Sequence, residues 1–192
     1  DPAGVRDAGA GGAGGADPAA FARPVRSILC ILHGRPVSFS LFGLKSGAKT
    51  TGNKFFFPNP FRPAGADDYF RRLEKSLVMV DPACRKTKIL RESEKILARK
   101  RMKSEMSEEL LAEVVHLTEY PTVLIGDFDP SFLDIPDVVL KSAMSHHQRY
   151  FPVTTNSGAL APHFLIVRNG PPDKKKLVAK GNARVLKARF SD

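Results

Sequence analysis

The sequence predicts an α+β fold in which antiparallel hairpins pack with several helices. Two observations support this prediction. Some segments alternate apolar and small polar residues, as half-buried strands do, whereas others repeat apolar residues every three or four positions, as helices do. Hairpins and helical runs follow one another in blocks, which is not the regular alternation of a doubly wound parallel sheet. The 192 residues, 42% hydrophobic and 26% charged, suit one domain with an irregular piece attached.

Composition excludes two classes of protein. No apolar run reaches the roughly 18 residues that a membrane-spanning helix needs, so an integral membrane protein is excluded. Cys30 and Cys84 form no CxxC pair, which excludes a zinc ribbon or a disulfide scaffold. Cys30 lies in an apolar stretch, where we expect it to be a small core residue.

The first 20 residues are rich in Ala and Gly and have almost nothing to bury, so we expect this leader to be disordered. Gly9, Gly11 and Gly14 match GxGxxG, but no strand precedes them and no helical pattern follows, so a dinucleotide site is not indicated. The chain begins with Asp1, and we expect it to be a piece of a longer protein. Within 21–192 we expect a β-rich part (about 21–63), a helical part (66–119) and a mixed part (120–192).

The β-rich part reads as a hairpin. Val25 to Leu32 is apolar and β-prone, residues 33–36 form a turn, and Val37 to Leu44 alternates apolar and small polar residues. Phe55 to Pro63 cannot be helical, because its prolines lack the amide donor.

Three helices are expected in the helical part. Asp67 or Asp68 can cap the first, whose apolar positions extend to Leu77. Asp81 as N-cap, followed by a proline in the first turn, predicts a second helix running to about Lys103. Ser107, followed by two glutamates and an apolar stripe, starts a third that ends before Pro121.

The mixed part begins with a short strand, Thr122 to Ile125, and a turn over residues 127–130. Pro136 opens a helix through about His146. Residues 150–154 and 163–167 read as two strands joined by an Asn-Ser-Gly turn, a second hairpin. The segment from Asp173 is helix-prone and basic.

The net charge of +10 is unevenly distributed. Residues 84–103 hold nine Lys and Arg against two Glu, residues 104–140 hold nine acidic residues and no Lys or Arg, and residues 168–192 hold eight basic residues against two Asp. Such basic helices favour phosphate binding through counterion release. Solvated helices whose charges meet the acidic block explain the same pattern equally well. Aromatic RNP motifs, C2H2 spacing and basic zippers are absent from the sequence, so no nucleic-acid-binding fold is named.

No catalytic motif stands out. The strings GxSxG, HExxH and the P-loop are absent from the sequence. His146 and His147 are adjacent, so on a helix they point about 100° apart and cannot share a metal; we expect one to face the core or a strand and the other solvent. Asp127 and Asp129 read as turn residues. We therefore assign no catalytic and no metal-binding residue, and the residues alone indicate a binding or scaffolding part.

Several short strings stand out along the chain: residues 21–26 (FARPVR), 33–37 (HGRPV), 43–47 (GLKSG), 117–121 (LTEYP), 128–133 (FDPSFL), 147–153 (HQRYFPV) and 181–189 (GNARVLKAR). In this order they resemble the N-terminal third of the β subunit of bacterial-type glycyl-tRNA synthetase. The resemblance covers about residues 20 to 192, and residues 1–19 match nothing in the family. One departure is Gly52-Asn53-Lys54-Phe55, where the family reads Gly-His-Arg-Phe.

This resemblance implies a role in attaching glycine to its tRNA. In the family the α subunit, or the corresponding half of a fused organellar chain, carries the class II catalytic core and uses ATP with magnesium. The β part contributes tRNA recognition and assembly. The implied partners are a glycine tRNA and the catalytic α part, in a hetero-oligomer or a dimer of the fused form, with no membrane. The implied compartment is the bacterial cytoplasm, a chloroplast or a mitochondrion, and this piece alone is expected to be non-catalytic.

Under this hypothesis the basic helices supply the RNA contacts. Gly181-Asn182 is interpreted as a turn or helix cap. After it, spacings of three residues and roughly one helical turn are expected to place Arg184, Lys187 and Arg189 on one face of a helix. Two alternatives stay open: a free-standing basic RNA-binding adaptor without ligase activity, and a hydrolase built on His146 or His147. The candidate RNA-binding residues are Arg85, Lys88, Arg99, Gln148, Arg149, Asn182, Arg184, Lys187 and Arg189.

Overall fold

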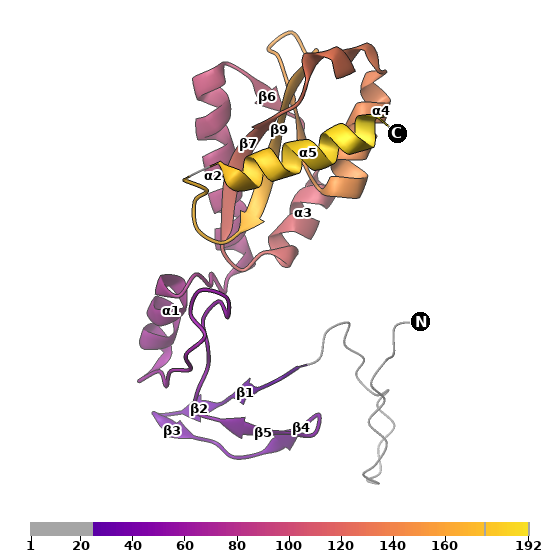
Figure 1. Cartoon of the computed structure of the whole chain (residues 1–192). Coiled ribbons are helices and arrows are strands. Elements are labelled where there is room, and N and C mark those ends of the chain that lie inside the picture. The colour runs from indigo at the N-terminus through magenta and orange to yellow at the C-terminus, as the bar shows by residue number, and fades with distance from the viewer. Residues whose placement is uncertain (1–24, 175, 192) are drawn as a thin grey trace. The chain divides into compact units, whose positions relative to one another are not determined.

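The computed structural model describes residues 25–174 and 176–191, which form two compact units divided after Ser76. The expected disorder of residues 1–20 lies outside the described residues. Helices are combined with small sheets whose strands pair mostly antiparallel, so the predicted α+β class is confirmed (Figure 1). No helix among the described residues is long and apolar enough to cross a membrane.

The described part of unit 1, residues 25–76, carries five short strands and one helix. β5 pairs in parallel with β1 and antiparallel with β4, and β2 pairs antiparallel with β3. The elements are β1 (Ile28–Leu29), β2 (Ile31–Leu32), β3 (Arg35–Pro36), β4 (Ser40–Leu41), β5 (Leu44–Gly47) and α1 (Ala66–Lys75).

The long strand expected over residues 37–44 is wrong, because the chain turns inside it. Two tight two-residue turns, His33-Gly34 and Phe42-Gly43, have positive φ at both positions, as type I′ hairpin turns require. The first lies within the predicted turn, whereas the second creates an additional hairpin. Cys30, expected in the core, is only half-buried.

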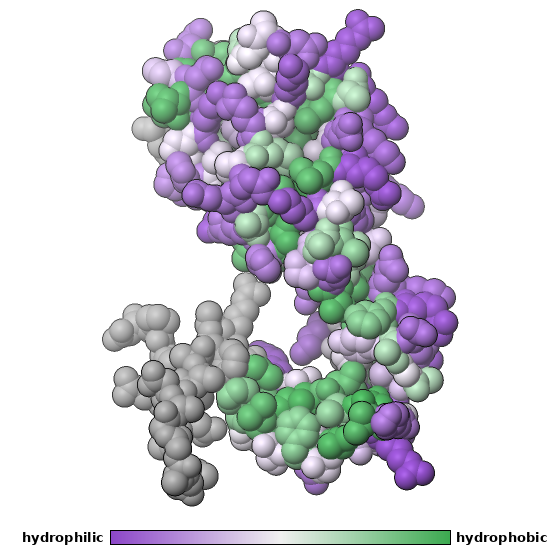
Figure 2. Space-filling model, turned by 180° about the vertical axis from the view of Figure 1, so that it is seen from behind, coloured by the Kyte–Doolittle hydropathy of each residue, from purple (hydrophilic) through white to green (hydrophobic). Residues whose placement is uncertain are grey.

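Unit 1 leaves much of its apolar surface exposed. Leu73 is the buried large hydrophobic residue in its described part, while Leu32 is 60% exposed and Phe55 is 85% exposed. Figure 2 shows hydrophobic residues gathered over the strands of this unit. Residues 55–63 contain no helix, as predicted. The helix α1 ends at Lys75 because Leu77, expected inside it, adopts a positive φ of 59°.

Unit 2, from Leu77 on, is built around a four-stranded antiparallel sheet with the order β6-β8-β9-β7. The second predicted hairpin is confirmed as β8 and β9, and the predicted short strand at residues 122–125 extends over all of β7. The elements are α2 (Pro82–Lys100), β6 (Lys103–Ser104), α3 (Glu108–Leu117), β7 (Pro121–Asp127), the 3-10 helix η1 (Pro130–Asp134), α4 (Asp137–Ser142), the π-helical turn η2 (Ala143–His147), β8 (Phe151–Thr154), β9 (Leu160–Asn169) and α5 (Leu177–Ser191).

Helices cover both faces of this sheet, so unit 2 has two cores. On one face α2 and α3 pack against alternate strand residues, including Val123 and Leu165. On the other face α4, η2 and α5 pack against the residues between them, including Phe164 and Ile166. Figure 1 shows α5 lying across the sheet. At Gly126 an added Cβ would come within 2.6 Å of the Phe164 ring, so this position needs glycine.

Local signals placed two helix starts correctly. Asp81 accepts the Ala83 amide at 2.8 Å and Ser107 accepts the Leu110 amide at 3.3 Å, as expected for N-caps. The helix α2 ends at Lys100 rather than Lys103, because Arg101 turns left-handed and residues 103–104 join the sheet as β6. For α1 the predicted caps are wrong, since Gly65 is the N-cap and Asp67 and Asp68 lie in the first turn.

Candidate nucleic-acid interface

Four of the nine predicted RNA-binding side chains are engaged within unit 2. The Arg85 guanidinium donates to the carbonyl oxygens of Met79, Val80 and Val115 at 2.6, 3.1 and 3.0 Å, so it ties the start of α2 to the loop before it and to α3. Lys88 pairs with Glu92 and lies 5.1 Å from the centre of the Tyr120 ring, with its side chain only 15% exposed. Both residues have structural partners.

Arg149 and Asn182 are the other two. Arg149 has a φ of 57°, and its Nε donates to a Glu113 carboxylate oxygen at 2.5 Å. Asn182 accepts the Tyr150 hydroxyl at 2.6 Å and donates to the Val178 carbonyl at 2.9 Å. The Gly181-Asn182 pair lies inside α5, so its interpretation as a turn or cap is wrong. The Asn182 side chain instead bonds back along the helix to Val178 and across to Tyr150.

Burial of the Tyr150 side chain raises the pKa of its phenol from 10.0 to about 12. The hydroxyl is therefore protonated at neutral pH and acts as the donor to Asn182. This bond joins α5 to the segment that leads from η2 into β8. Asn182 thus positions α5, and the basic residues that follow, on the sheet.

The remaining candidates are Gln148, which is half-buried, and four exposed basic residues, Arg99, Arg184, Lys187 and Arg189. They do not form one surface. Arg99 comes from α2, which packs on one face of the sheet, whereas the other three basic residues come from α5 on the opposite face. A polyanion that follows α5 therefore meets a different set of charges from one that follows α2.

Along α5 the bases form a stripe that the sequence reasoning identified only in part. At about 100° per residue, Lys180, Arg184 and Lys187 fall on one side, away from the buried Ala179 and Leu186. Arg189 points to another side of the helix and does not line up with Arg184 and Lys187. Lys180 was missed, although its spacing of four and seven residues from the other two was a readable signal. We call Lys180, Arg184 and Lys187 the α5 stripe.

The α5 stripe is next to a carboxylate held by local hydrogen bonds. Asp129 accepts the Ser131 amide at 3.0 Å and the Ser131 hydroxyl at 2.9 Å. These bonds, with a smaller contribution from the positive charge of Lys187, lower the pKa of the Asp129 carboxyl below its ordinary value. The predicted turn chemistry at Asp129 is thereby supported, since Asp129 also caps η1.

The histidines offer little catalytic machinery. His146 and His147 are both exposed, so the expectation that one of them faces the core or a strand is wrong; His146 Nδ1 lies 3.2 Å from the Ser142 hydroxyl. Sequence reasoning missed a different pair: His163 Nδ1 lies 2.5 Å from an Asp127 carboxylate oxygen across β7 and β9. Among the described residues, no group of three or more His, Cys, Asp or Glu side chains is placed to hold a metal.

A cleft of about 900 Å³ opens between α3 and α4. Its lining includes Glu105, Glu109 and Asp137, with Lys141 forming an ion pair to Glu105 at 3.5 Å. The surplus of carboxylates repels phosphate, so the cleft and the α5 stripe differ in the ligands that they favour.

Comparison with known proteins decides the family. Residues 14–192 match the family described as "Glycyl-tRNA synthetase beta subunit". The chain belongs to this family. The match begins a few residues before the expected start of the resemblance, so the statement that residues 1–19 match nothing is wrong for residues 14–19.

Curated relatives agree with this assignment. The chain is 43% identical over 172 residues to the glycine–tRNA ligase beta subunit of Syntrophomonas wolfei and 39% identical over 172 residues to that of Moorella thermoacetica. It is 37% identical over 177 residues to that of Acaryochloris marina. In each case the match covers 90% of this chain and 25% of the relative. The chain thus spans about a quarter of the length of these relatives.

Proposed function

We propose that this chain supplies a tRNA-binding and assembly part of a glycine–tRNA ligase. The observation that carries the proposal is the α5 stripe at the surface of a chain of the glycyl-tRNA synthetase beta-subunit family. Three positive charges on one helix face, anchored by the Tyr150–Asn182 bond, suit an RNA backbone, which gains affinity from the counterions it releases. The exposed Arg99 offers a separate contact on the other face of the sheet.

In this proposal the chain positions the tRNA and does not itself make or break covalent bonds. The ligase activates glycine with ATP and transfers it to the 3′ end of the tRNA, and a catalytic alpha part with ATP and magnesium performs those steps. The α5 stripe holds phosphates of the tRNA, so that the tRNA is presented to that catalytic part. We assign no catalytic residue to this chain, and we place it with the alpha part in the bacterial cytoplasm or in an organelle.

A role in assembly is supported by the surface of unit 1. Its large side chains, such as Leu41 and Phe42, are 47% and 46% exposed, and Phe55 is 85% exposed. Apolar area of this kind is typical of surfaces that another protein covers.

The proposal is tested by titrating the 192-residue chain with a glycine tRNA, an unrelated tRNA and duplex DNA, each at low and at moderate salt. We expect the glycine tRNA to keep its advantage as salt rises. If both tRNAs and the DNA lose affinity along one steep salt line, the chain is a general basic adaptor and the proposal of tRNA recognition fails.

Variants of α5 sharpen the test. Replacing Lys180, Arg184 and Lys187 together with Gln should reduce the slope of log affinity against log salt by roughly 2, because each neutralised phosphate adds about 0.7 to that slope. Arg189→Gln removes one charge from another side of the same helix, and its effect should be smaller than that of Arg184→Gln. Equal losses of affinity from these two single variants would show that only net charge matters.

A further inference from the structure

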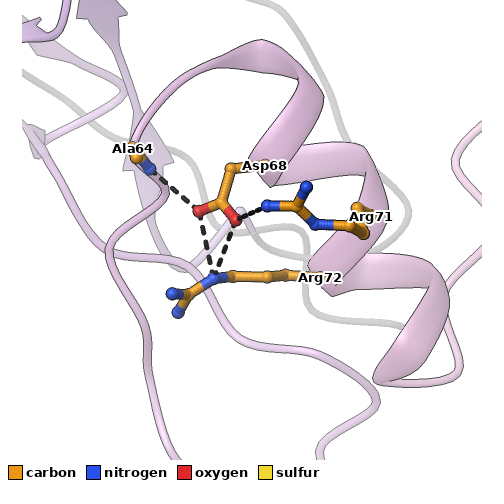
Figure 3. A network of polar contacts seen from close by, with 4 residues as sticks. All are labelled: Ala64, Asp68, Arg71 and Arg72. Carbon is orange, nitrogen blue, oxygen red and sulfur yellow. Dashed lines mark hydrogen bonds and ion pairs between the residues drawn. The ribbon is translucent and has the colours of Figure 1, made fainter.

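Two arginines lie close together in unit 1, in the second half of α1. The Asp68 carboxylate accepts the Ala64 amide at 3.0 Å, and it forms ion pairs with Arg71 at 2.7 Å and Arg72 at 3.0 Å. Figure 3 shows the carboxylate between the two guanidinium groups. The Ala64 amide, followed by Arg71, lowers the pKa of the Asp68 carboxyl to about 2, so it is ionised at neutral pH. One fixed anion therefore orients two arginines.

Both arginines keep donors that these contacts do not use. Arg71 pairs through one Nη and Arg72 pairs through its Nε, so both Nη groups of Arg72 take no part in the network. The side chains are 63% and 48% exposed, which leaves these donors open to a ligand. The Arg72 guanidinium also lies 5.4 Å from the centre of the Phe61 ring, which restricts its orientation.

Helix geometry concentrates the positive charge on one face. Asp68, Arg71, Arg72 and Lys75 fall within an arc of about 100°, opposite the buried Leu73. This face carries three positive charges and one negative charge. The other acidic residues of α1, Asp67 and Glu74, lie outside the arc. The helix as a whole carries three charges of each sign, so any preference for an anion here comes from placement and not from net charge.

We propose that Arg71, Arg72 and Lys75 form a phosphate-binding site for the RNA backbone, with Asp68 as a positioning residue. This inference rests on the proposed function, because a tRNA is the polyphosphate that a glycine–tRNA ligase recruits. Guanidinium groups bind phosphate oxygens through paired N–H donors, and groups held in place beforehand lose less conformational freedom on binding. The site is separate from the α5 stripe, which belongs to unit 2.

The test compares two variants that change the charge of α1 equally. Asp68→Asn and Glu74→Gln each remove one negative charge from the helix. If charge alone governs binding, both variants raise the affinity of the chain for glycine tRNA. If Asp68 positions the arginines, Glu74→Gln leaves the affinity unchanged or raises it, whereas Asp68→Asn lowers it by roughly threefold or more.

A second variant separates positioning from folding. Asp68→Asn also weakens the bond to Ala64, so its thermal stability is measured alongside. The double variant Arg71→Lys/Arg72→Lys keeps Asp68, its bond to Ala64 and the net charge, but it removes the two planar guanidinium groups and their paired N–H donors. We expect this double variant to weaken tRNA binding by roughly tenfold at low salt. Tripolyphosphate and ATP are titrated in parallel, and binding of these at the same site with no effect of the variants on tRNA would assign it to free nucleotides and overturn the RNA assignment.

The outcomes separate this inference from the proposed function. If the wild-type chain binds glycine tRNA but the double Lys variant and Asp68→Asn bind it equally well, the α1 site is refuted and the α5 stripe is unaffected. If Asp68→Asn strengthens binding in step with Glu74→Gln, the positioning role is refuted. If the wild-type chain binds no tRNA, the proposed function and this site are refuted together.

Discussion

Glu92 accepts the backbone amide of Val123 at 2.9 Å, so a side chain of α2 takes up a hydrogen-bond donor of β7. In the sheet order β7 is a terminal strand, with β9 as its neighbour. The other carboxylate oxygen of Glu92 pairs with Lys88. One carboxylate thus binds α2 to the edge of the sheet, where an open strand would otherwise offer its amides to another chain.

Glu92→Ala should lower the free energy of unfolding by about 1–3 kcal/mol, because it leaves the part-buried Val123 amide and Lys88 without this partner. Denaturant unfolding of the chain measures the change. Glu94→Ala is the matched control, since it removes the same charge from an exposed position of α2. Equal effects of the two substitutions would contradict a bridging role for Glu92.

Gly126→Ala should destabilise unit 2 by about 1–3 kcal/mol, because the new methyl group meets the Phe164 ring inside the sheet core. Gly181→Ala provides the contrast. Gly181 lies within α5, and a methyl group added there would have no atom within 4 Å, so alanine should raise the free energy of unfolding by roughly 0.5–1 kcal/mol. Denaturant midpoints of the two variants should move in opposite directions, and a shift in the same direction would refute this packing.

Tyr150→Phe should cost about 0.5–1.5 kcal/mol at neutral pH through loss of the bond to Asn182. The effect should shrink in alkali. The pKa of the phenol is raised to about 12 in the folded chain against 10.0 for the free group, so the unfolded chain loses this proton first. The contribution is present in full below pH 10 and is lost between pH 10 and 12. Unfolding of both proteins across this window measures it, and a constant difference would contradict the raised pKa.

Asp81→Ala should lower the free energy of unfolding by about 1 kcal/mol, because the N-cap bond to the Ala83 amide disappears. Asp67→Ala removes a first-turn carboxylate that makes no cap bond in α1, so its effect should be smaller. Circular dichroism followed during denaturation tests both. A larger loss from Asp67→Ala would show that the α1 start is capped differently.

The elements that the sequence predicted best are those whose signals are local. Asp81 and Ser107 cap the helices that follow them, and Asn156 to Gly158 joins β8 to β9, because a few neighbouring residues suffice for each. In unit 1 the strands are two to four residues long, too short for the alternation of side chains to define their ends. The turn at Phe42-Gly43 was missed because a phenylalanine rarely adopts positive φ.

The geometry of the candidate site depends on contacts between residues that are far apart in the sequence. Asn182 bonds to Tyr150 and Arg149 to Glu113, pairs separated by 32 and 36 positions. The spacing of bases along a helix predicts which face they share, and on that basis Lys180 was within reach of the sequence. The sequence could not show which basic side chains have partners inside unit 2, because those contacts depend on how helices and strands pack.

The position of α5 after the strands that it covers has a consequence during synthesis. A ribosome releases β7, β8 and β9 before it releases Leu186, the α5 residue that is fully buried in the second core. The face of the sheet that carries Phe164 and Ile166 is therefore only partly covered, by α4 and η2, and stays exposed to solvent until α5 has been synthesised. The same helix carries the α5 stripe, so the second core is completed and these three basic side chains reach their final positions in a single step of folding.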